Sequence, residues 1–593
     1  MCRGLVLAIV LVILLSGWVG ITLKVERVRA SGTIYIRADG SVDPSSAPIS
    51  TIDNITYTLT SDIYDSIRME RDNIILDGVG YKIQGTGSEK GIDLSGRTNV
   101  TINGTSIKSF YFGIYLDQFS SGNIISKNKI KNCQIGIEVY GHYNIISEND
   151  IANNYQGIEL RGASNTAILG NNITTNTGNG ISLAGYELDP DLDIVISGNT
   201  ITKNNEGISL GDSKNTSVVG NNITENNSWG IELYGSNNNI SQNLFSQNVG
   251  GIYIFGSNHN ISGNNVSDNN YYGILIQDST GNMLRSNSIT RCNYNLGVKG
   301  SRLSDFVNDM DESNIIDGKP VCYWINKQDM IVPIDVGYLA VVNSTNITIR
   351  GLELKNNYQG ILLAYTKNST IIDNNVATNL EGIHLWGSSG NNVSRNNIRD
   401  NMNGIILKSS YLNTLLENNV TNSGFCDVQL DWSHSNTISG NEMVASQYYG
   451  LRLLQSSDNV VFENRIENNQ GGISLYSSSD NRFYHNFLMN NTPQVSSETS
   501  TNMWDNGYPS GGNYWSNYTD IDLYSGPYQN ETGSDGIWDH PYVIDGSNRD
   551  NYPIVPEFSS LIILPLFMIA TLLTVIVYKK KAYCRANIAC KIT

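Results

Sequence analysis

Aromatic and charged residues recur at two fixed places of a repeated phrase, two and four residues after the glycine of a Gly-Ile pair. In a strand, these two places project on one face, opposite to the Ile and Leu between them. Aromatic rings stack on the apolar face of a pyranose, and carboxylates accept its hydroxyls. We therefore expect an outward glycan-binding face made of Glu138, Tyr140, Glu159, Arg161, Glu232, Tyr234, Tyr253, Phe255, His384 and Trp386.

The alternative is ordinary β-propensity, since Tyr and Phe favour exposed strands in any case. Other copies of the phrase carry small residues at these places, such as Ser182 and Ser209. Because the columns are interrupted there, a glycan site is expected to be local to residues 136–162 and 230–256.

Acidic residues cluster at two further places. Asp520 and Asp522 form an Asp-x-Asp pair, and Asp535 and Asp539 lie in "DGIWD". Oxygen-rich Asp/Gly loops are what Ca²⁺ prefers, so calcium is the candidate metal, although the spacing differs from an EF-hand and a plain acidic turn is the alternative. The second cluster, Glu187, Asp189, Asp191 and Asp193, offers no acid/base pair with a partner, so catalysis is not expected from it.

A repeat of about 22 residues must position these side chains. Gly-Ile pairs begin at Gly91 and recur to Gly273, then resume at Gly360 and again at Gly472, mostly at steps of 21 to 23 residues. Within each step the apolar residues alternate over three or four places and are separated by Asn, Gly and Ser, which indicates short strands and tight turns. A fixed period of this kind predicts a solenoid, here an all-β parallel β-helix with three strands per coil.

The polarity of the repeat follows from that fold. A narrow coil buries few aliphatic side chains, and stacking joins them into continuous Ile and Leu columns. Asn at equivalent corners, such as Asn171, Asn221 and Asn264, is expected to form hydrogen-bonded ladders. Asn-x-Ser/Thr triplets arise from the same consensus, and some are glycosylation candidates on an exported protein.

Charge and cysteine content exclude some classes. The chain has 593 residues and a formal charge of −17, which argues against nucleic acid as a partner, because phosphate binding needs a basic surface. Cys133, Cys292, Cys322 and Cys426 are irregularly spaced without a CxxC, which disfavours zinc. Single thiols in the core are expected, with a Cys292–Cys322 disulfide as the alternative.

The segments at both ends predict export and anchoring. Residues 1–30 read as a signal peptide, with an uncleaved anchor as the alternative. Residues 559–578 are apolar and long enough for a transmembrane helix, and Lys579–Lys581 place the tail 579–593 in the cytoplasm. The protein is therefore expected on the extracellular face of the cell membrane as a single-pass protein.

Between these ends, the sequence divides by pattern. The predicted parts are an N-terminal cap with the first coil, a first run of repeats, an interruption that suggests a hairpin, a second run of repeats and a Tyr/Trp/Asp-rich cap. Their boundaries are 31–90, 91–300, 301–345, 346–491 and 492–555.

Three features together resemble the NosD-type (CASH) right-handed parallel β-helix family, which has a pectin-lyase-like fold. They are the Asn-rich coils, the "GKPV-Y" to "VP-D-GY" interruption from Gly318 to Tyr338, and the tail "GNYWSNYTDIDLY…DNYP" from Gly512 to Pro553. The resemblance covers residues 33–555. It implies carbohydrate-binding relatives, many on archaeal cell surfaces. Pro556–Phe558 with the following span resembles a PEF-CTERM sorting signal, but the chain continues a dozen residues past the lysines.

The founding members of that family are associated with copper delivery. Here the six histidines occupy different edges of the repeat, and no Met or Cys stands at ligand spacing from them, which makes copper unlikely. We expect a surface-anchored, non-catalytic β-helix that binds or organises glycans at the cell envelope. The alternatives are a polysaccharide lyase, hydrolase or C5-epimerase, a structural stalk or adhesin, and a NosD-like copper-handling protein.

Overall fold

The computed structural model describes residues 32–185 and 191–555, and within them the only helix is a short 3-10 turn, η1 (Leu303–Phe306). The rest is built from short strands that pair mostly in parallel with the strand one coil away, so the predicted all-β parallel β-helix is confirmed. The chain divides into two compact units between Glu159 and Leu160.

The first unit begins with an antiparallel cap. β2 (Val42–Asp43) pairs antiparallel with β1 (Thr33–Ile36), and β3 (Ile49–Ser50) does so with β4 (Thr56–Leu59). Parallel coils follow. The strands that carry the Gly-Ile phrase, or that occupy the equivalent position in their coil, are β5 (Ser66–Met69), β8 (Lys90–Asp93), β11 (Phe112–Leu116) and β14 (Ile135–Val139). The cap covers the first coil, whose bare edge would otherwise offer unpaired backbone groups.

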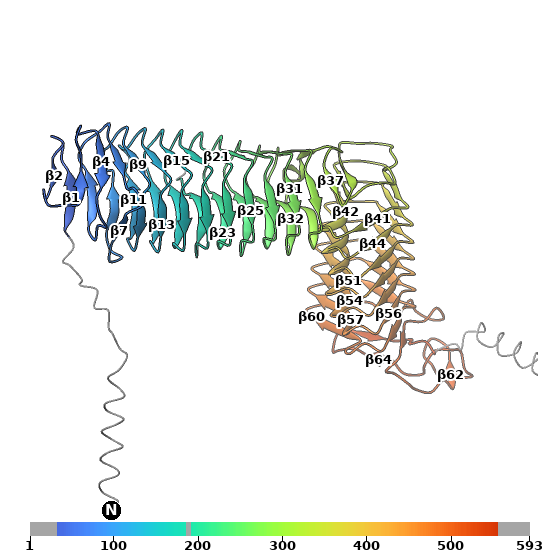
Figure 1. Ribbon diagram of the computed structural model, residues 1–593. Helices are drawn as coiled ribbons and strands as arrows, with labels where there is room; N and C mark the ends of the chain where they lie inside the picture. Colours follow the sequence, from blue (N-terminus) through green and yellow to red (C-terminus); the bar gives the residue numbers. More distant parts are fainter. Residues whose placement is uncertain (1–31, 186–190, 556–593) are drawn as a thin grey trace, which may run out of the picture. The chain divides into compact units, whose positions relative to one another are not determined.

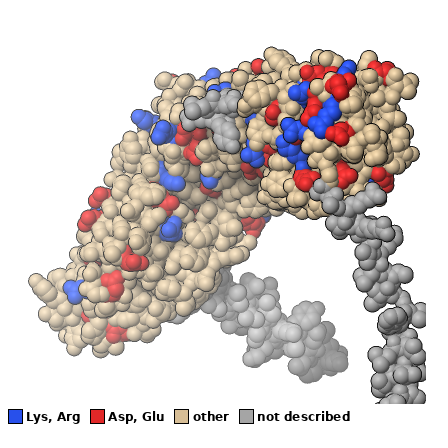
Figure 2. All heavy atoms as spheres, turned by 90° about the vertical axis from the view of Figure 1, so that its left-hand side faces the viewer, with Lys and Arg blue, Asp and Glu red and all other residues tan. Residues whose placement is uncertain are grey.

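Charged residues of both signs are interspersed on the end of the molecule that carries β1 and β2 (Figure 2). Arg37 lies 3.2 Å from Glu70, Lys82 lies 3.4 Å from Asp62, and Arg97 lies 3.3 Å from Asp72. Such mixed charges oppose edge-to-edge association of the solenoid end.

The second unit starts with a stack of parallel coils (Figure 1). Its Gly-Ile strands are β20 (Asn179–Leu183), β23 (Glu206–Leu210), β26 (Trp229–Leu233), β29 (Gly250–Ile254), β32 (Tyr272–Gln277) and β35 (Tyr294–Lys299). Equivalent residues are in register from coil to coil, so Ile208, Ile231 and Ile252 form one fully buried column. Two further rows of three-residue strands, β21 (Val195–Ser197) to β33 (Met283–Arg285) and β22 (Thr200–Thr202) to β34 (Ser288–Thr290), close each coil.

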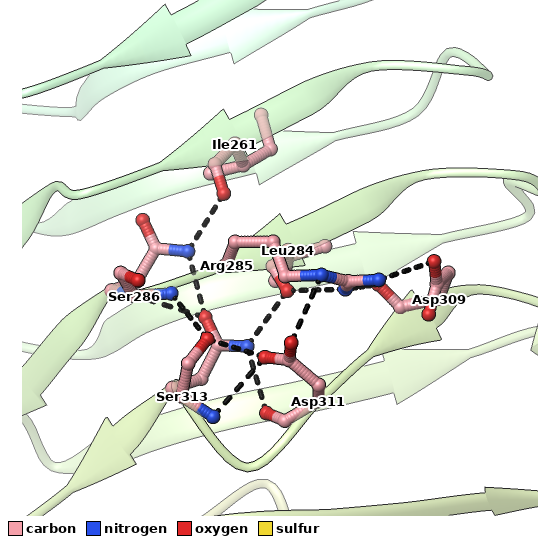
Figure 3. A network of polar contacts seen from close by, with 9 residues as sticks. Ile261, Leu284, Arg285, Ser286, Asp309, Asp311 and Ser313 are labelled. Carbon is pink, nitrogen blue, oxygen red and sulfur yellow. Dashed lines mark hydrogen bonds and ion pairs between the residues drawn. The ribbon is translucent and has the colours of Figure 1, made fainter.

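The first stack ends where the sequence interrupts the repeat. β36 (Asp309–Met310) and β37 (Ile315–Ile316) still pair parallel with the preceding coil. Arg285 holds this segment: its Nη1 donates to the Asp309 backbone oxygen at 2.8 Å, and its Nε lies 3.0 Å from Asp311 Oδ2 (Figure 3). Ser286 N donates to Ser313 Oγ at 2.8 Å in the same network.

A tight turn then redirects the chain. β38 (Lys319–Ile325) pairs antiparallel with β37, and the two residues between them, Asp317 and Gly318, both have positive φ, 47° and 86°. Asp-Gly is the preferred pair for a two-residue hairpin turn that needs positive φ at both places. The predicted hairpin is present, and Tyr323 of β38 donates to Phe306 O at 2.6 Å. β38 also pairs in parallel with β39 (Tyr338–Val342) and starts a second stack.

The second stack repeats the first arrangement. Its Gly-Ile strands and their variants are β42 (Gln359–Ala364), β45 (Glu381–Trp386), β48 (Asn403–Lys408), β51 (Cys426–Asp431), β54 (Tyr449–Leu454) and β57 (Gly471–Tyr476), followed by β60 (Val495–Glu498). The backbone of residues 356–358 also bonds to β35: Asn295 N donates to Asn356 O at 2.6 Å, and Tyr358 N donates to Leu296 O at 2.9 Å. The two stacks therefore meet at β35, which we call the junction.

Buried asparagines form the predicted ladders. In the first stack, each amide Nδ2 donates to the Oδ1 of the next asparagine at 2.8–3.0 Å, through Asn171, Asn199, Asn221, Asn243, Asn264, Asn287 and Asn314. The second stack has an equivalent ladder from Asn374 to Asn513, with spacings of 2.9 Å. Each side chain thus satisfies turn backbone groups that would otherwise be buried without partners.

The C-terminal cap ends these ladders. Asn513 N donates to Asp550 Oδ2 at 2.7 Å, and Trp515 Nε1 donates to the same oxygen at 2.9 Å. Asn548 accepts from Asn502 N at 2.9 Å, at the end of a parallel ladder. The cap itself contains the short hairpins β62 (Tyr524–Ser525)–β63 (Glu531–Thr532) and β64 (Tyr542–Val543)–β65 (Arg549–Asp550).

Several predictions fall outside the described residues. They are the signal peptide 1–30, Glu187 and Asp189, the Pro556–Phe558 motif, the span 559–578 and the tail 579–593. Over residues 32–185 and 191–555, no helix has the length and apolar character needed to cross a membrane.

Candidate functional site

The outward face of the second stack carries two columns of side chains that include polar, charged and aromatic groups. Pairing in register places His384 next to Ile406 and then Gln429, and Trp386 next to Lys408 and then Asp431. Neighbouring parallel strands lie about 4.8 Å apart, so each column brings side chains from β45, β48 and β51 within reach of one another.

A hollow of about 480 Å³ lies where these columns meet the ends of β32 and β35. We call it the junction pocket. Polar and aromatic side chains share its wall, among them Glu381, His384, Trp386, Lys408, Phe425 and Asp431. From the first stack, Asp278 and Lys299 complete the wall, and Phe306 of η1 lies beside them.

Glu381 and His384 form a closely bonded pair in this wall. Glu381 Oε2 lies 2.7 Å from His384 Nδ1, and it also accepts from Gln359 Nε2 at 3.2 Å. Gln359 is fixed in turn, because its Nε2 donates to Val298 O at 3.0 Å and its Oε1 accepts from Tyr338 OH at 3.2 Å. The imidazole is therefore held in one orientation by both stacks.

The other nitrogen of this histidine is unsatisfied. His384 is 7% exposed, and its Nε2 has no hydrogen-bond partner among the described residues. A buried polar atom without a partner is unfavourable by about 1–3 kcal/mol, so it favours a ligand that supplies the missing bond. With Glu381 accepting from Nδ1–H, Nε2 carries a lone pair that can accept a hydrogen bond or a proton.

Trp386 and Lys408 form the second feature of the wall. Lys408 Nζ lies 4.3 Å from the centroid of the Trp386 ring, a cation–π contact, and Phe306 lies 6.1 Å from the same ring on the opposite stack. Asp431 accepts from Gln429 Nε2 at 2.8 Å and lies 3.6 Å from Arg452. The pocket thus combines apolar ring surface with donors and acceptors of both charges.

The predicted face brings its residues together in part. His384 and Trp386 line the junction pocket, although His384 is buried and not exposed as the alternation predicts. Tyr234 and Phe255 are neighbours on adjacent coils with ring centroids 5.8 Å apart, and both are exposed. Tyr234 OH donates to Glu232 Oε2 at 2.9 Å, and Tyr253 lies beside them.

Two further members of the predicted face are buried, although the sequence predicts that they are exposed. Glu138 is 1% exposed and Glu159 is 6% exposed, so neither carboxylate is available on an open surface. Tyr140 and Arg161 are partly exposed. The alternation of a strand predicts on which face a side chain lies, but it does not predict which neighbouring residues bury it. The burial of these two glutamates was therefore not predicted.

The four aspartates predicted to bind calcium serve as acceptors for backbone and side-chain groups of the cap. Asp522 accepts from Asp535 N and Gly536 N at 3.1 Å, and Asp539 accepts from Leu523 N and Tyr524 N at 3.1–3.2 Å. Asp520 Oδ2 lies 2.8 Å from His540 Nδ1. Within the described residues, no group of three or more His, Cys, Asp or Glu side chains is placed to hold a metal ion. Calcium binding stays a prediction, to be tested by the effect of chelation on thermal unfolding.

Sequence reasoning missed Glu381, Lys408 and Asp431. A signal for two of them was available: Lys408 lies four places after Gly404, and Asp431 lies four places after Asp427, which replaces the repeat glycine. Reading the column through Asp427 would have found both. That Asp278, Lys299 and Phe306 lie beside these residues could not be predicted from the sequence, because it depends on how the two stacks pack against each other.

The comparisons with known proteins agree with this architecture. The profile described as "Periplasmic copper-binding protein (NosD)" matches residues 188–324 and 312–520, which together span more than half of the 593 residues. The chain belongs to the NosD family. A second profile, the right-handed beta helix region, matches residues 51–188 and 90–245. A search of curated proteins returns no match.

Solved structures with similar coils include three of different kinds. Geobacillus virus E2 ORF18 is 14% identical, with a TM-score of 0.34 over 46% of this chain and 55% of its own, so this chain spans about half of it. A Paenibacillus alginate lyase is 14% identical, with a TM-score of 0.28 over 40% and 91%. The periplasmic alginate epimerase AlgG is 12% identical, with a TM-score of 0.19 over 76% and 80%. At these scores the likenesses carry no argument about function.

The family description raises the question of copper. Copper sites use imidazole, thiolate or thioether ligands that converge on one point. In this chain three histidines each make a separate hydrogen bond. His259 Nδ1 accepts from Asn238 N within a ladder, His434 Nδ1 accepts from Ser457 N, and His485 Nε2 lies 2.7 Å from Ser510 O. The described residues do not fit a copper centre.

Proposed function

We propose that this NosD-family protein binds glycan chains in the junction pocket and does so without catalysing a reaction. The observation that carries the proposal is the unsatisfied Nε2 of His384 in a wall that also holds an aromatic ring and several charged groups. Sugars combine apolar ring faces with hydroxyls that both donate and accept, so they match such a mixed surface. Pockets of about 300–1,000 Å³ are typical of small-ligand sites.

The setting of this activity is the cell envelope. Export by residues 1–30 and anchoring by residues 559–578 would hold the β-helix outside the membrane, with Lys579–Lys581 on the cytoplasmic side. Protease added to intact cells should then remove the β-helix. Its full protection in intact cells, with digestion after lysis, would contradict this placement.

Glycan-array binding of the full-length protein tests the pocket. Trp386→Ala should lower the array signal at least tenfold, because it removes the aromatic ring and its cation–π contact with Lys408. The matched control is Tyr476→Ala. Tyr476 occupies the same strand place four coils further along the column that runs from Trp386 through Lys408, Asp431 and Leu454, and it is exposed. This variant should bind as the parent does.

Two results would count against glycan binding in the junction pocket. Equal binding by the Trp386→Ala and Tyr476→Ala variants would place any glycan site elsewhere. Absence of binding to every glycan on the array would favour the structural stalk or adhesin.

The Glu381–His384 pair favours one second candidate, an enzyme that moves a proton on the bound sugar. Glu381 orients the ring through Nδ1, and Nε2 would accept the proton. Incubation with uronate polysaccharides, followed by assays for reducing ends and unsaturated uronates, separates the two functions. Product that disappears in His384→Asn, while array binding persists, would establish the enzyme.

A further inference from the structure

A second, larger hollow adjoins the junction pocket along the same coils. It has a volume of about 670 Å³ and is lined by the turns directly before the strands of the junction pocket. In each of three consecutive coils, a residue that lines this hollow is followed within two positions by a residue that lines the junction pocket. The three pairs are Asn379 and Glu381, Met402 and Asn403, and Gly424 and Phe425. We call this space the turn hollow.

The first stack shows the same change along β35. Tyr294, at the start of the strand, lines the turn hollow, and Val298 and Lys299, at its end, line the junction pocket. At about 3.3 Å per residue, these ends are roughly 13–16 Å apart. The two hollows are thus consecutive along one edge of the junction.

One aromatic residue, Tyr358, lies in sequence between residues that line the two hollows. Tyr358 falls between Asn356 of the turn hollow and Gln359 of the junction pocket, and it packs over Gly297, where an added Cβ would approach its Cβ to 2.3 Å. Its ring stacks on that of Tyr272 with centroids 6.0 Å apart and planes at 19°. This stacking fixes the segment that connects the two linings.

The turn hollow differs from the junction pocket in chemistry. Amides and hydroxyls dominate its wall, and its charged groups already have partners: Arg291 bonds Asp268 at 2.6 and 2.7 Å, and Asp400 accepts from Asn422 at 2.6 Å. Gln447 lies exposed at this wall. Neutral donors and acceptors of this kind suit the hydroxyls of a sugar and give no charge to attract a phosphate or an acidic peptide.

We propose that the turn hollow and the junction pocket are consecutive subsites for one linear glycan chain, with the turn hollow taking its neutral, hydroxyl-rich residues. This inference rests on the proposed glycan binding and adds its substrate class: an unbranched oligosaccharide longer than a disaccharide. A chain that fills both hollows makes two sets of contacts for one loss of translational freedom, so affinity should rise with length until both are occupied.

Array binding of the full-length protein to oligosaccharides of two, four, six and eight residues tests this. The probes are unbranched glucan, mannan, galactan and polyuronate series. The signal should rise at least tenfold between the shortest and the longest members of the series that binds. Gln447→Trp, which narrows the turn hollow with a bulky indole, should reduce long-chain binding to the level of the disaccharide.

The matched control is Gln470→Ala beside Gln447→Ala. Gln447 N donates a hydrogen bond to Ser423 O, and Gln470 N donates one to Ser446 O, so the two glutamines occupy the same place of the turn in adjacent coils. Of the two, Gln447 lines the hollow and Gln470 does not. Length-independent binding that still needs Trp386 would overturn the two-subsite inference and leave the proposed function in place. Loss of binding at every length in Gln447→Trp, but not in Gln447→Ala, would likewise overturn it, since it would show one site.

Discussion

Trp229 and Tyr272 lie two coils apart, yet their rings stack with centroids 5.5 Å apart and planes at 4°. The residue between them in register is Gly250. A Cβ added there would lie 2.2 Å from Cε3 and Cζ3 of Trp229, so the absence of a side chain is what allows the indole to lie across the intervening coil. With Tyr358 stacked on Tyr272, these rings form a continuous series that reaches the junction.

Gly250→Ala should therefore disrupt this series. The indole must move, and we expect a loss of about 1–3 kcal/mol in the free energy of unfolding, as for other overpacked sites. Near-ultraviolet circular dichroism and urea unfolding of the full-length protein measure the two effects. Gly546→Ala is the control, since nothing lies within 4 Å of a Cβ at Gly546. Equal behaviour of the two variants would show that the indole is not constrained by Gly250.

The asparagine ladder should be sensitive at each rung. Asn418→Ala leaves Asn396 N without its acceptor and removes the side-chain donor to Val393 O, both in the interior. Each buried group left unsatisfied is unfavourable by about 1–3 kcal/mol, so the variant should lose several kcal/mol of stability or fail to accumulate.

The adjacent Asn419→Ala is the control for that experiment. Asn419 is exposed, and its side chain makes one bond, to Asn397 Oδ1 at 3.1 Å. Its substitution should change stability by less than about 1 kcal/mol. Similar unfolding midpoints for the two variants would contradict a structural role for the ladder.

Glu206 should make stability depend on pH. Burial, with a smaller contribution from the negative charge of Glu232, raises the pKa of Glu206 to about 8 from its ordinary 4.5. The folded protein thus keeps a proton that the unfolded chain loses above pH 4.5. This stabilisation is complete below about pH 4.5 and is lost as the pH rises towards 8, by about 1.4 kcal/mol for each unit of the pKa difference.

Glu206→Gln should remove that part of the decline between pH 5 and pH 8. Urea unfolding at both values measures it, and Glu225→Gln, at an exposed glutamate, should retain the parent's decline. An unchanged decline in Glu206→Gln would show that this carboxyl is ionised in the folded state at neutral pH.

The four cysteines of the described residues should resist alkylation. All four are free and buried, in agreement with the expected core thiols and not with a Cys292–Cys322 disulfide. Burial raises the pKa of Cys133 to about 11 and that of Cys322 and Cys426 to about 12, so little thiolate is present. Iodoacetamide labelling mapped by mass spectrometry should mark these residues only in guanidinium chloride, and rapid native labelling would contradict their burial.

Some of this protein was determined by local sequence. The period of the Gly-Ile phrase, the alternation within it and the corner asparagines specify coils, registers and ladders, because each coil contacts mainly its neighbours and repeats their solution. The Asp317–Gly318 hairpin also has a local signal, since both residues tolerate positive φ. The outward places of His384 and Trp386 follow from alternation alone.

The candidate site depended on tertiary structure. Glu381 and His384 come from one strand, but Gln359 orients them by bonding Val298, and Phe306 faces Trp386 from 80 positions earlier in the chain. The repeat pattern predicts the contacts between one coil and the next. It contains no information on where the second stack packs against the first. That placement follows from the packing of β35 against residues 356–359, and it converts exposed strand positions into a pocket with a buried, unsatisfied imidazole.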